Sequence, residues 1–127
     1  SCGVSAVVHA APRLDPGKVA GAFLVAPPDL DAHSGLHPAS DGGFAPVPMT
    51  ALPVPARLIA SSNDPYCSTE RAQEMGRAWG ADTSVIANAG HLNTASGHGP
   101  WPDGLLTFGL FLKSLGDPPH PIGGAAT

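Results

Sequence analysis

The feature that most constrains the fold is a continuous apolar run, VAGAFLVA at residues 19–26, which is bounded by Gly-Lys before it and by two prolines after it. A run of this kind is typical of a strand that is buried on both faces of a parallel sheet. Two further runs have strand character, ARLIAS at 56–61 and the β-branched segment DTSVIAN at 82–88. Three such strands need helices on both faces of the sheet to cover them.

Helical patterns occur between these strands. Valines at helical spacing predict a short helix over residues 2–11, which must end before Pro12. A second helix is predicted from about Ser68 to Trp79, with Ser68 as its N-terminal cap. Arg71 stands where Glu or Gln would complete a capping box, so no box is expected.

The last helix is predicted over residues 103–115, with Leu105, Phe108 and Leu112 as its apolar stripe. The proline-rich segment 27–55 has no sustained periodicity and is predicted to be a long loop that helps to wall a site. Residues 116–127 are predicted to be a disordered tail. The order of elements predicts an α/β fold, a parallel sheet of about three strands flanked by helices.

Length and charge narrow the classes of function. A chain of 127 residues that is 43% hydrophobic and 13% charged fits about one soluble globular domain. The net charge is −4 and the six lysines and arginines are scattered, which argues against nucleic acid or an anionic membrane as a partner. No apolar stretch reaches the ~20 residues of a membrane helix. Cys2 and Cys67 lack the spacing of a disulfide scaffold, so we expect a reduced, cytoplasmic protein.

Three residues with the chemistry of a nucleophile, an acid and a base occur in that order: Ser1, Asp64 in SSNDPYCS, and His91 in NAGHLN. This is the chain order of the triad in α/β-hydrolases, whose serine lies on a turn between a strand and a helix. Asp64 and His91 each follow a predicted strand, and the carboxyl ends of parallel strands share one edge of a sheet. A serine hydroxyl attacks when a base takes its proton and a third group orients that base. The pattern predicts these three roles.

Other polar residues receive more limited roles. The N–H of Cys2, directly after the serine at a helix start, is the predicted oxyanion donor. His33 and His37 stand four residues apart near acidic side chains. The surrounding prolines oppose the helix that such a metal site would need, so no metal is expected here. His98 is expected to line a pocket beside Trp101.

Four blocks carry a resemblance to a known family: VAGAFLVAPPD, FAPVP, SSNDPYCSTERA and AGHLNTASGHGPWPDG. They resemble the small α/β-hydrolases related to retinoblastoma-binding protein nine and to bacterial YdeN-like proteins. The resemblance implies a partial α/β-hydrolase fold, a Ser1-Asp64-His91 triad and hydrolysis of small esters or amides without a cofactor. It also implies that residues 1–115 are the C-terminal part of such a domain, starting at its nucleophile, with the early strands and the second oxyanion donor absent.

Two alternatives remain open. Taken singly, an Asp-Pro turn and a Gly-His loop are more often structural than catalytic. The chain would then be a non-catalytic interaction module derived from a hydrolase, with a strand edge that pairs with a missing N-terminal half or with another chain. Alternatively, Ser1 is an N-terminal nucleophile with its own amine as base, which leaves Asp64 and His91 without a role. With a strand missing, we expect these 127 residues alone to be inactive and poorly soluble.

Overall fold

The computed structural model describes residues 2–33 and 43–116. Short helices and strands alternate through this part of the chain, as the sequence predicted. They are α1 (Cys2–Ala10), η1 (Ala11–Arg13), β1 (Ala22–Val25), α2 (Leu30–His33), β2 (Ala56–Ser61), α3 (Thr69–Trp79), β3 (Ala81–Ile86), η2 (Thr94–Ser96) and α4 (Pro102–Ser114).

The three strands form one parallel sheet in the order β1-β2-β3, which confirms the predicted sheet. β1 is shorter than the apolar run that predicted it. Its hydrogen bonding to β2 begins with the N–H of Ala22 on Pro55 O and ends with the N–H of Ala26 on Ile59 O, both within 2.9 Å. Pairing with the neighbour therefore sets the ends of this strand, and the apolar residues before it lie outside the ladder.

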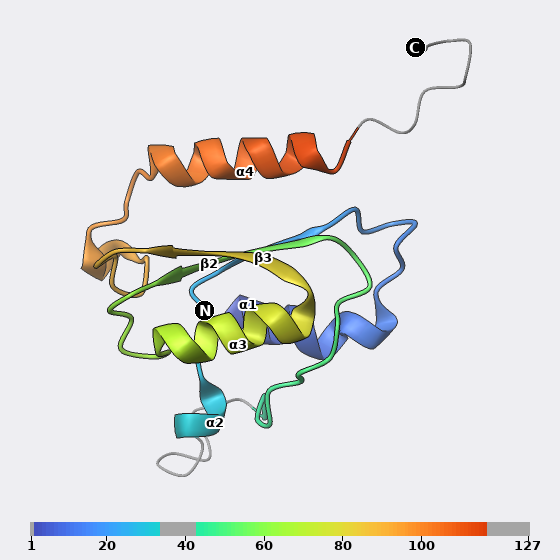
Figure 1. The fold of residues 1–127 in the computed structure, drawn as a ribbon, viewed down its shortest axis with the longest axis horizontal. Coiled ribbons are helices and arrows are strands. Elements are labelled where there is room, and N and C mark those ends of the chain that lie inside the picture. The colour runs from blue at the N-terminus through green and yellow to red at the C-terminus, as the bar shows by residue number, and fades with distance from the viewer. Residues whose placement is uncertain (1, 34–42, 117–127) are drawn as a thin grey trace.

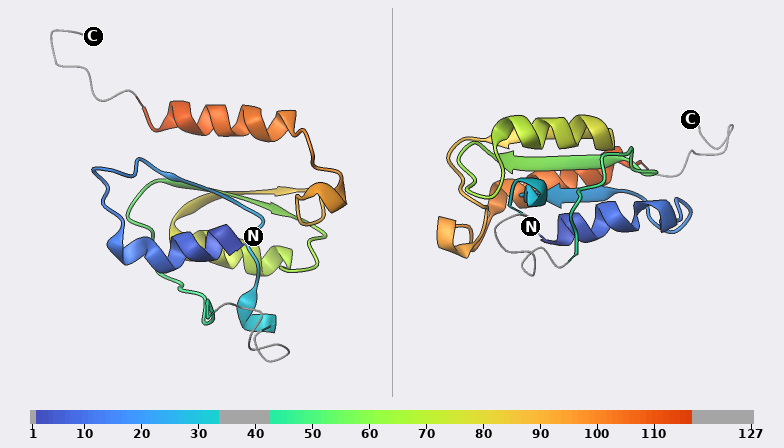
Figure 2. Two further views of the ribbon diagram at one scale, coloured as in Figure 1. Left: turned by 180° about the vertical axis from the view of Figure 1, so that it is seen from behind. Right: turned by 90° about the horizontal axis from the view of Figure 1, so that it is seen from below.

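Helices cover both faces of the sheet, as the apolar strands require. Figure 1 and Figure 2 show α1 and α3 on one face and α4 across the other. The core lies between the sheet and the helices α1 and α3. The indole N–H of Trp79 in this core donates to the carbonyl oxygen of Pro48 at 2.7 Å. The most deeply buried members of the core include Val8, Leu24, Leu58, Met75 and Trp79.

Helix α3 begins and ends at recognisable local signals. Ser68 is its N-cap, and the Ser68 hydroxyl accepts the N–H of Arg71 at 3.1 Å, as predicted. Gly80, with φ of 71°, ends the helix in the left-handed region, and β3 begins one residue later. Gly76 faces β3 so closely that a Cβ at this position would overlap the Thr83 hydroxyl. The tight packing of α3 on β3 therefore depends on glycine.

Helix α4 packs differently from the prediction. Phe108 and Phe111 contact Phe23 of β1, with ring centroids 5.1 and 5.7 Å apart. Leu105 and Leu112 are 72% and 51% exposed, so the predicted stripe of Leu105, Phe108 and Leu112 is wrong except at Phe108. The two aromatic rings occupy the face of α4 that packs on the sheet, so Leu105 and Leu112 lie on the face that points away from it.

The remaining predictions concern the loop and the tail. The proline-rich segment 27–55 holds one short helix, α2, and its residues 34–42 lie outside the described part of the chain, as do residues 117–127 of the predicted tail. Among the helices within residues 2–33 and 43–116, none is both long and apolar enough to cross a membrane.

Candidate active site

Asp64 lies just beyond the carboxyl end of β2, in the turn formed by Asn63-Asp64-Pro65. Its side chain is 2% exposed. One carboxylate oxygen, Oδ1, accepts the backbone N–H of Tyr66 at 2.9 Å. This bond closes the turn and fixes the direction of the carboxylate, so that the other oxygen faces the loop that follows β3.

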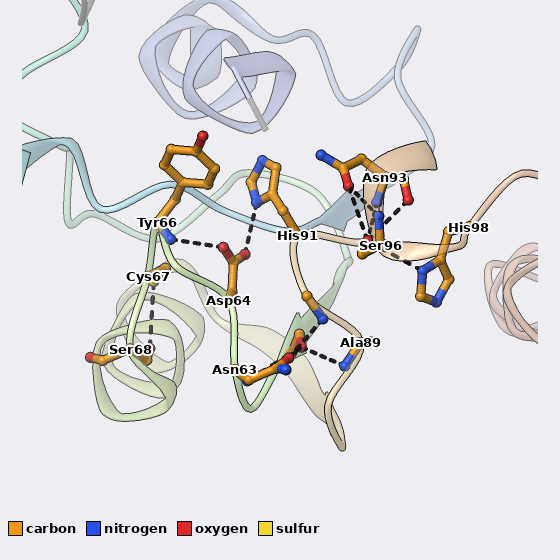
Figure 3. Close-up of polar contacts among 12 residues, drawn as sticks. Asn63, Asp64, Tyr66, Cys67, Ser68, Ala89, His91, Asn93, Ser96 and His98 are labelled. Atoms are coloured by element: carbon orange, nitrogen blue, oxygen red, sulfur yellow. Dashed lines mark hydrogen bonds and ion pairs between the residues drawn. The ribbon is translucent and has the colours of Figure 1, made fainter.

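His91 meets that second oxygen. Its Nδ1 atom lies 2.8 Å from Asp64 Oδ2, and the imidazole side chain is largely buried. Figure 3 shows the two side chains directed at each other from the loops after β2 and β3. A carboxylate accepts hydrogen bonds, so this contact assigns the proton to Nδ1 and leaves the lone pair on Nε2. The structure thus brings together two of the three residues that the sequence predicted as a triad.

Tyr66 is part of the same arrangement and was not predicted from the sequence. Its ring packs edge-on against the His91 imidazole, with centroids 4.7 Å apart and planes at 62°. Its backbone carbonyl accepts the N–H of Asp29 at 2.7 Å, which ties the acid turn to the segment after β1. The signal in the sequence was an aromatic residue two positions after the acid, outside any helical or strand periodicity.

Arg71 connects this segment to α3. Its guanidinium contacts Asp29 Oδ1 at 3.4 Å, Asp31 Oδ2 at 2.7 Å and Glu74 Oε1 at 2.7 Å. The other oxygen of Asp31 accepts the N–H of Val47 at 2.9 Å. Arg71 therefore joins the start of the predicted site-walling loop to the helix that follows the acid, and Asp31 joins that start to Val47 later in the same loop.

Cys67, next to Tyr66, is buried and chemically protected. Burial raises the pKa of the Cys67 thiol to about 12, with the carboxylates of Asp29 and Asp64 adding to the rise and Arg71 opposing it. The sulfur donates to the carbonyl of Ser68 at 3.5 Å. A thiol that stays protonated is a poor nucleophile, so Cys67 has a packing role.

The predicted nucleophile, Ser1, lies outside the described residues, so its contact with His91 stays a prediction. Cys2 is the first residue of α1 and is exposed. The N–H groups of a first helical turn have no partner within the helix, which fits the predicted oxyanion role without testing it. In the view of Figure 3, the start of α1 lies on the side of His91 away from Asp64.

His98 and Trp101 lie next to each other, as expected, with ring centroids 6.0 Å apart. A pocket of about 280 Å³ lies elsewhere, between α4 and the amino-terminal halves of β2 and β3, and these two rings do not line it. Within residues 2–33 and 43–116 there is no group of three or more His, Cys, Asp or Glu side chains that could hold a metal ion. His37 lies outside this part of the chain.

The chain as a whole is similar to known proteins. The family described as serine hydrolase matches residues 1–109. Among solved structures, a YdeN-like hydrolase from Pectobacterium atrosepticum is similar, with a TM-score of 0.74 and 33% sequence identity. The similarity covers 91% of this chain and 57% of that one, so the chain spans less than two thirds of the hydrolase that it resembles. No curated protein matches the chain.

Proposed function

The chain belongs to the serine hydrolase family, and on this basis we propose that Ser1, Asp64 and His91 form the catalytic triad of an esterase- or amidase-like enzyme. The observation that carries the proposal is the 2.8 Å contact between Asp64 Oδ2 and His91 Nδ1, made by a carboxylate that is almost fully buried. An ordinary surface turn and an ordinary glycine loop have no need of such a contact.

The proposed reaction follows from the tautomer of His91. Its Nε2 atom takes the proton of the Ser1 hydroxyl as the serine oxygen attacks the carbonyl carbon of the substrate. The imidazolium that forms is stabilised by the ionised Asp64 through Nδ1–H, and it then protonates the leaving alcohol or amine. Water, activated by His91 in the same way, hydrolyses the acyl-serine and releases the acid. The N–H of Cys2 stabilises the oxyanion in both steps.

The test uses a fluorophosphonate probe and a small aryl ester on the longer protein that includes the further segment proposed below, because the 127 residues alone are expected to be inactive. We expect the probe to label Ser1, and we expect Ser1→Ala or His91→Ala to remove labelling and to lower ester turnover by about 10⁶-fold. Asp64→Asn leaves an oxygen for the Tyr66 N–H but disturbs the tautomer, so about a 10⁴-fold loss of kcat is expected. Cys2→Ala keeps the backbone donor and is the matched control. Full turnover by Ser1→Ala contradicts the proposal.

We also propose that the catalytic unit includes a further polypeptide segment that covers α4 and extends the sheet beyond β1. β1 is the end strand of the sheet order, and the similar hydrolase is longer than this chain. Four leucines on α4 are between 51% and 72% exposed, which is unusual for large apolar side chains on a single helix. They are Leu105, Leu106, Leu110 and Leu112.

This second proposal predicts how the 127 residues behave alone. We expect them to bind a hydrophobic dye, to self-associate in sedimentation experiments and to lack esterase activity. Leu106→Lys with Leu110→Lys is expected to reduce dye binding and association, because both side chains are exposed on α4. A monomer that binds no dye and hydrolyses esters contradicts it.

The substrate is proposed to be a small ester or amide, with neither nucleic acid nor a membrane as a partner, and no cofactor takes part in the proposed steps. A cytoplasmic location is proposed as well, because Cys2 and Cys67 are both free thiols, one exposed and one buried. Cell fractionation tests the location, and recovery of the protein from an oxidising compartment contradicts it.

A further inference from the structure

The loop before Asp64 and the loop before His91 are joined by side chains. Three consecutive side-chain oxygens accept three consecutive backbone N–H groups, and we refer to these bonds as the loop brace. Figure 3 shows part of it around Asn63 and Ala89. The bonds run from Asn88 N–H to Ser62 Oγ at 2.9 Å, from Ala89 N–H to Ser61 Oγ at 2.9 Å and from Gly90 N–H to Asn63 Oδ1 at 2.7 Å.

The inner part of the brace is a connected network. The Ser61 hydroxyl accepts the N–H of Ala89 and donates its own proton to Asn63 Oδ1 at 2.9 Å. Asn63 Oδ1 therefore accepts two hydrogen bonds, which fixes the orientation of its amide group. Ser61 is 1% exposed, so water does not compete for its bonds.

The brace begins where the sheet ends. The last backbone bond between the two segments runs from the N–H of Ser62 to Ile86 O at 2.9 Å. Beyond it, Asn88 and Gly90 have φ values of 53° and 60°, in the left-handed region. A Cβ at Gly90 would collide with the side chain of Ser96, so the loop is tightly folded there. A loop in this conformation needs bonds from outside to hold it.

From this geometry we propose that Ser61 and Asn63 are positioning residues for the proposed hydrolase reaction. They hold Ala89 and Gly90, the two residues before His91, against the segment that carries Asp64, so that Nδ1 and the carboxylate stay in contact. Neither side chain contacts the imidazole, and both act through the backbone of the His91 loop. The inference rests on the proposed function for its effect on rate, whereas its effect on the Asp64–His91 contact stands without it.

The test compares three substitutions in the longer protein that includes the proposed further segment. Asn63→Ala removes the acceptor for Gly90, whereas Asn63→Asp keeps an oxygen at that position. Ser62→Ala is the matched control, because Ser62 is an exposed serine that bonds to the same loop farther from His91. Because small misplacements of a base are costly, we expect Asn63→Ala to lower kcat about 10- to 100-fold with little change in KM. Asn63→Asp and Ser62→Ala are expected to stay within about threefold of the parent.

A second measurement separates positioning from simple stability and from catalysis. The Nδ1 proton of His91, bonded to a carboxylate, gives a far-downfield proton NMR signal that needs no turnover. We expect this signal in the parent, in Asn63→Asp and in Ser62→Ala, and its broadening or loss in a folded Asn63→Ala. If the signal follows this order but the longer protein, with its further segment present, has no hydrolase activity, the brace is supported and the proposed function fails. If Asn63→Ala keeps both the signal and the parent kcat, the brace inference is overturned.

Discussion

The ring of Tyr66 meets the imidazole of His91 edge-on, with centroids 4.7 Å apart, while the backbone N–H of Tyr66 binds the carboxylate that holds the same imidazole. One residue thus supports the acid through its backbone and the base through its side chain. An aromatic contact of this kind contributes ~0.5–1.5 kcal/mol beyond burial. We expect Tyr66→Ala to lower kcat/KM by about 2- to 10-fold. Tyr66→Phe keeps the ring and is expected to match the parent; equal losses in steady-state kinetics for both variants would argue against a role for the ring.

The two cysteines are predicted to react differently. Cys2 is exposed and Cys67 is buried, and burial raises the pKa of the Cys67 thiol to about 12. We expect iodoacetamide at pH 8 to modify Cys2 in the folded protein and Cys67 only after denaturation. Mass spectrometry of the labelled peptides measures this. Rapid modification of Cys67 in the folded protein would show that the segment around it opens readily.

The raised pKa of Cys67 also predicts a dependence of stability on pH. The unfolded thiol loses its proton near 9.0 and the folded one near 12, so between these values the folded state binds the extra proton. The free energy of unfolding therefore falls as pH rises from about 9 toward 12. Urea denaturation at several pH values measures the slope. Cys67→Ala removes this contribution, and an unchanged slope in that variant would be the contrary result.

Arg71 is predicted to be a major contributor to stability at the surface of α3. Its charge-assisted bonds to Asp29 and Asp31 link two segments far apart in sequence, and such bonds contribute ~1.5–3 kcal/mol each at best. We expect Arg71→Ala to lower the free energy of unfolding by about 1–3 kcal/mol. Glu74→Gln, which removes the most exposed of the three partners, is expected to cost less than about 1 kcal/mol. Similar losses in urea denaturation would contradict the ranking.

Replacing Gly76 by alanine tests how tightly α3 packs on β3, because helix propensity and packing predict opposite changes in stability. Alanine in a helix interior is favoured over glycine by about 1 kcal/mol. Here the added Cβ would overlap the Thr83 hydroxyl, so we expect Gly76→Ala to destabilise the protein by about 1–3 kcal/mol instead. The same substitution in a Thr83→Ala background should cost much less, because the opposing atom is gone. A stabilised Gly76→Ala in thermal melting would mean that α3 shifts away from β3 at little cost.

Much of the fold could be predicted from the sequence because its signals are local. A continuous apolar run predicted the first parallel strand, ARLIAS the second and a β-branched segment the third, and a serine before an amphipathic segment predicted the start of α3. The outward-facing leucines of α4 were not predicted, because the helical pattern alone did not reveal which apolar residues face the sheet. That choice depends on Phe23 of β1, which lies far away in sequence.

The candidate site was also predictable in part from the sequence. The positions of Asp64 and His91 after two strands indicated a shared edge, and the structure places their side chains in contact. Three features were not predicted: the contacts of Tyr66, the ion pairs of Arg71 and the loop brace. Each depends on the register between segments more than twenty residues apart, and a single sequence does not display that register. Ser1 and Cys2 remain predictions as nucleophile and oxyanion donor.

A single glycine, Gly80, makes the whole connection between α3 and β3, at the edge of the sheet opposite Asp64 and His91. An insertion there would disturb the packing of helix on strand, whereas the connections at the Asp64 edge are longer and run over residues 62–68 and 87–101. Evolution can therefore diversify what this family accepts by remodelling those connections, while the short helix–strand corner keeps the scaffold unchanged beneath them.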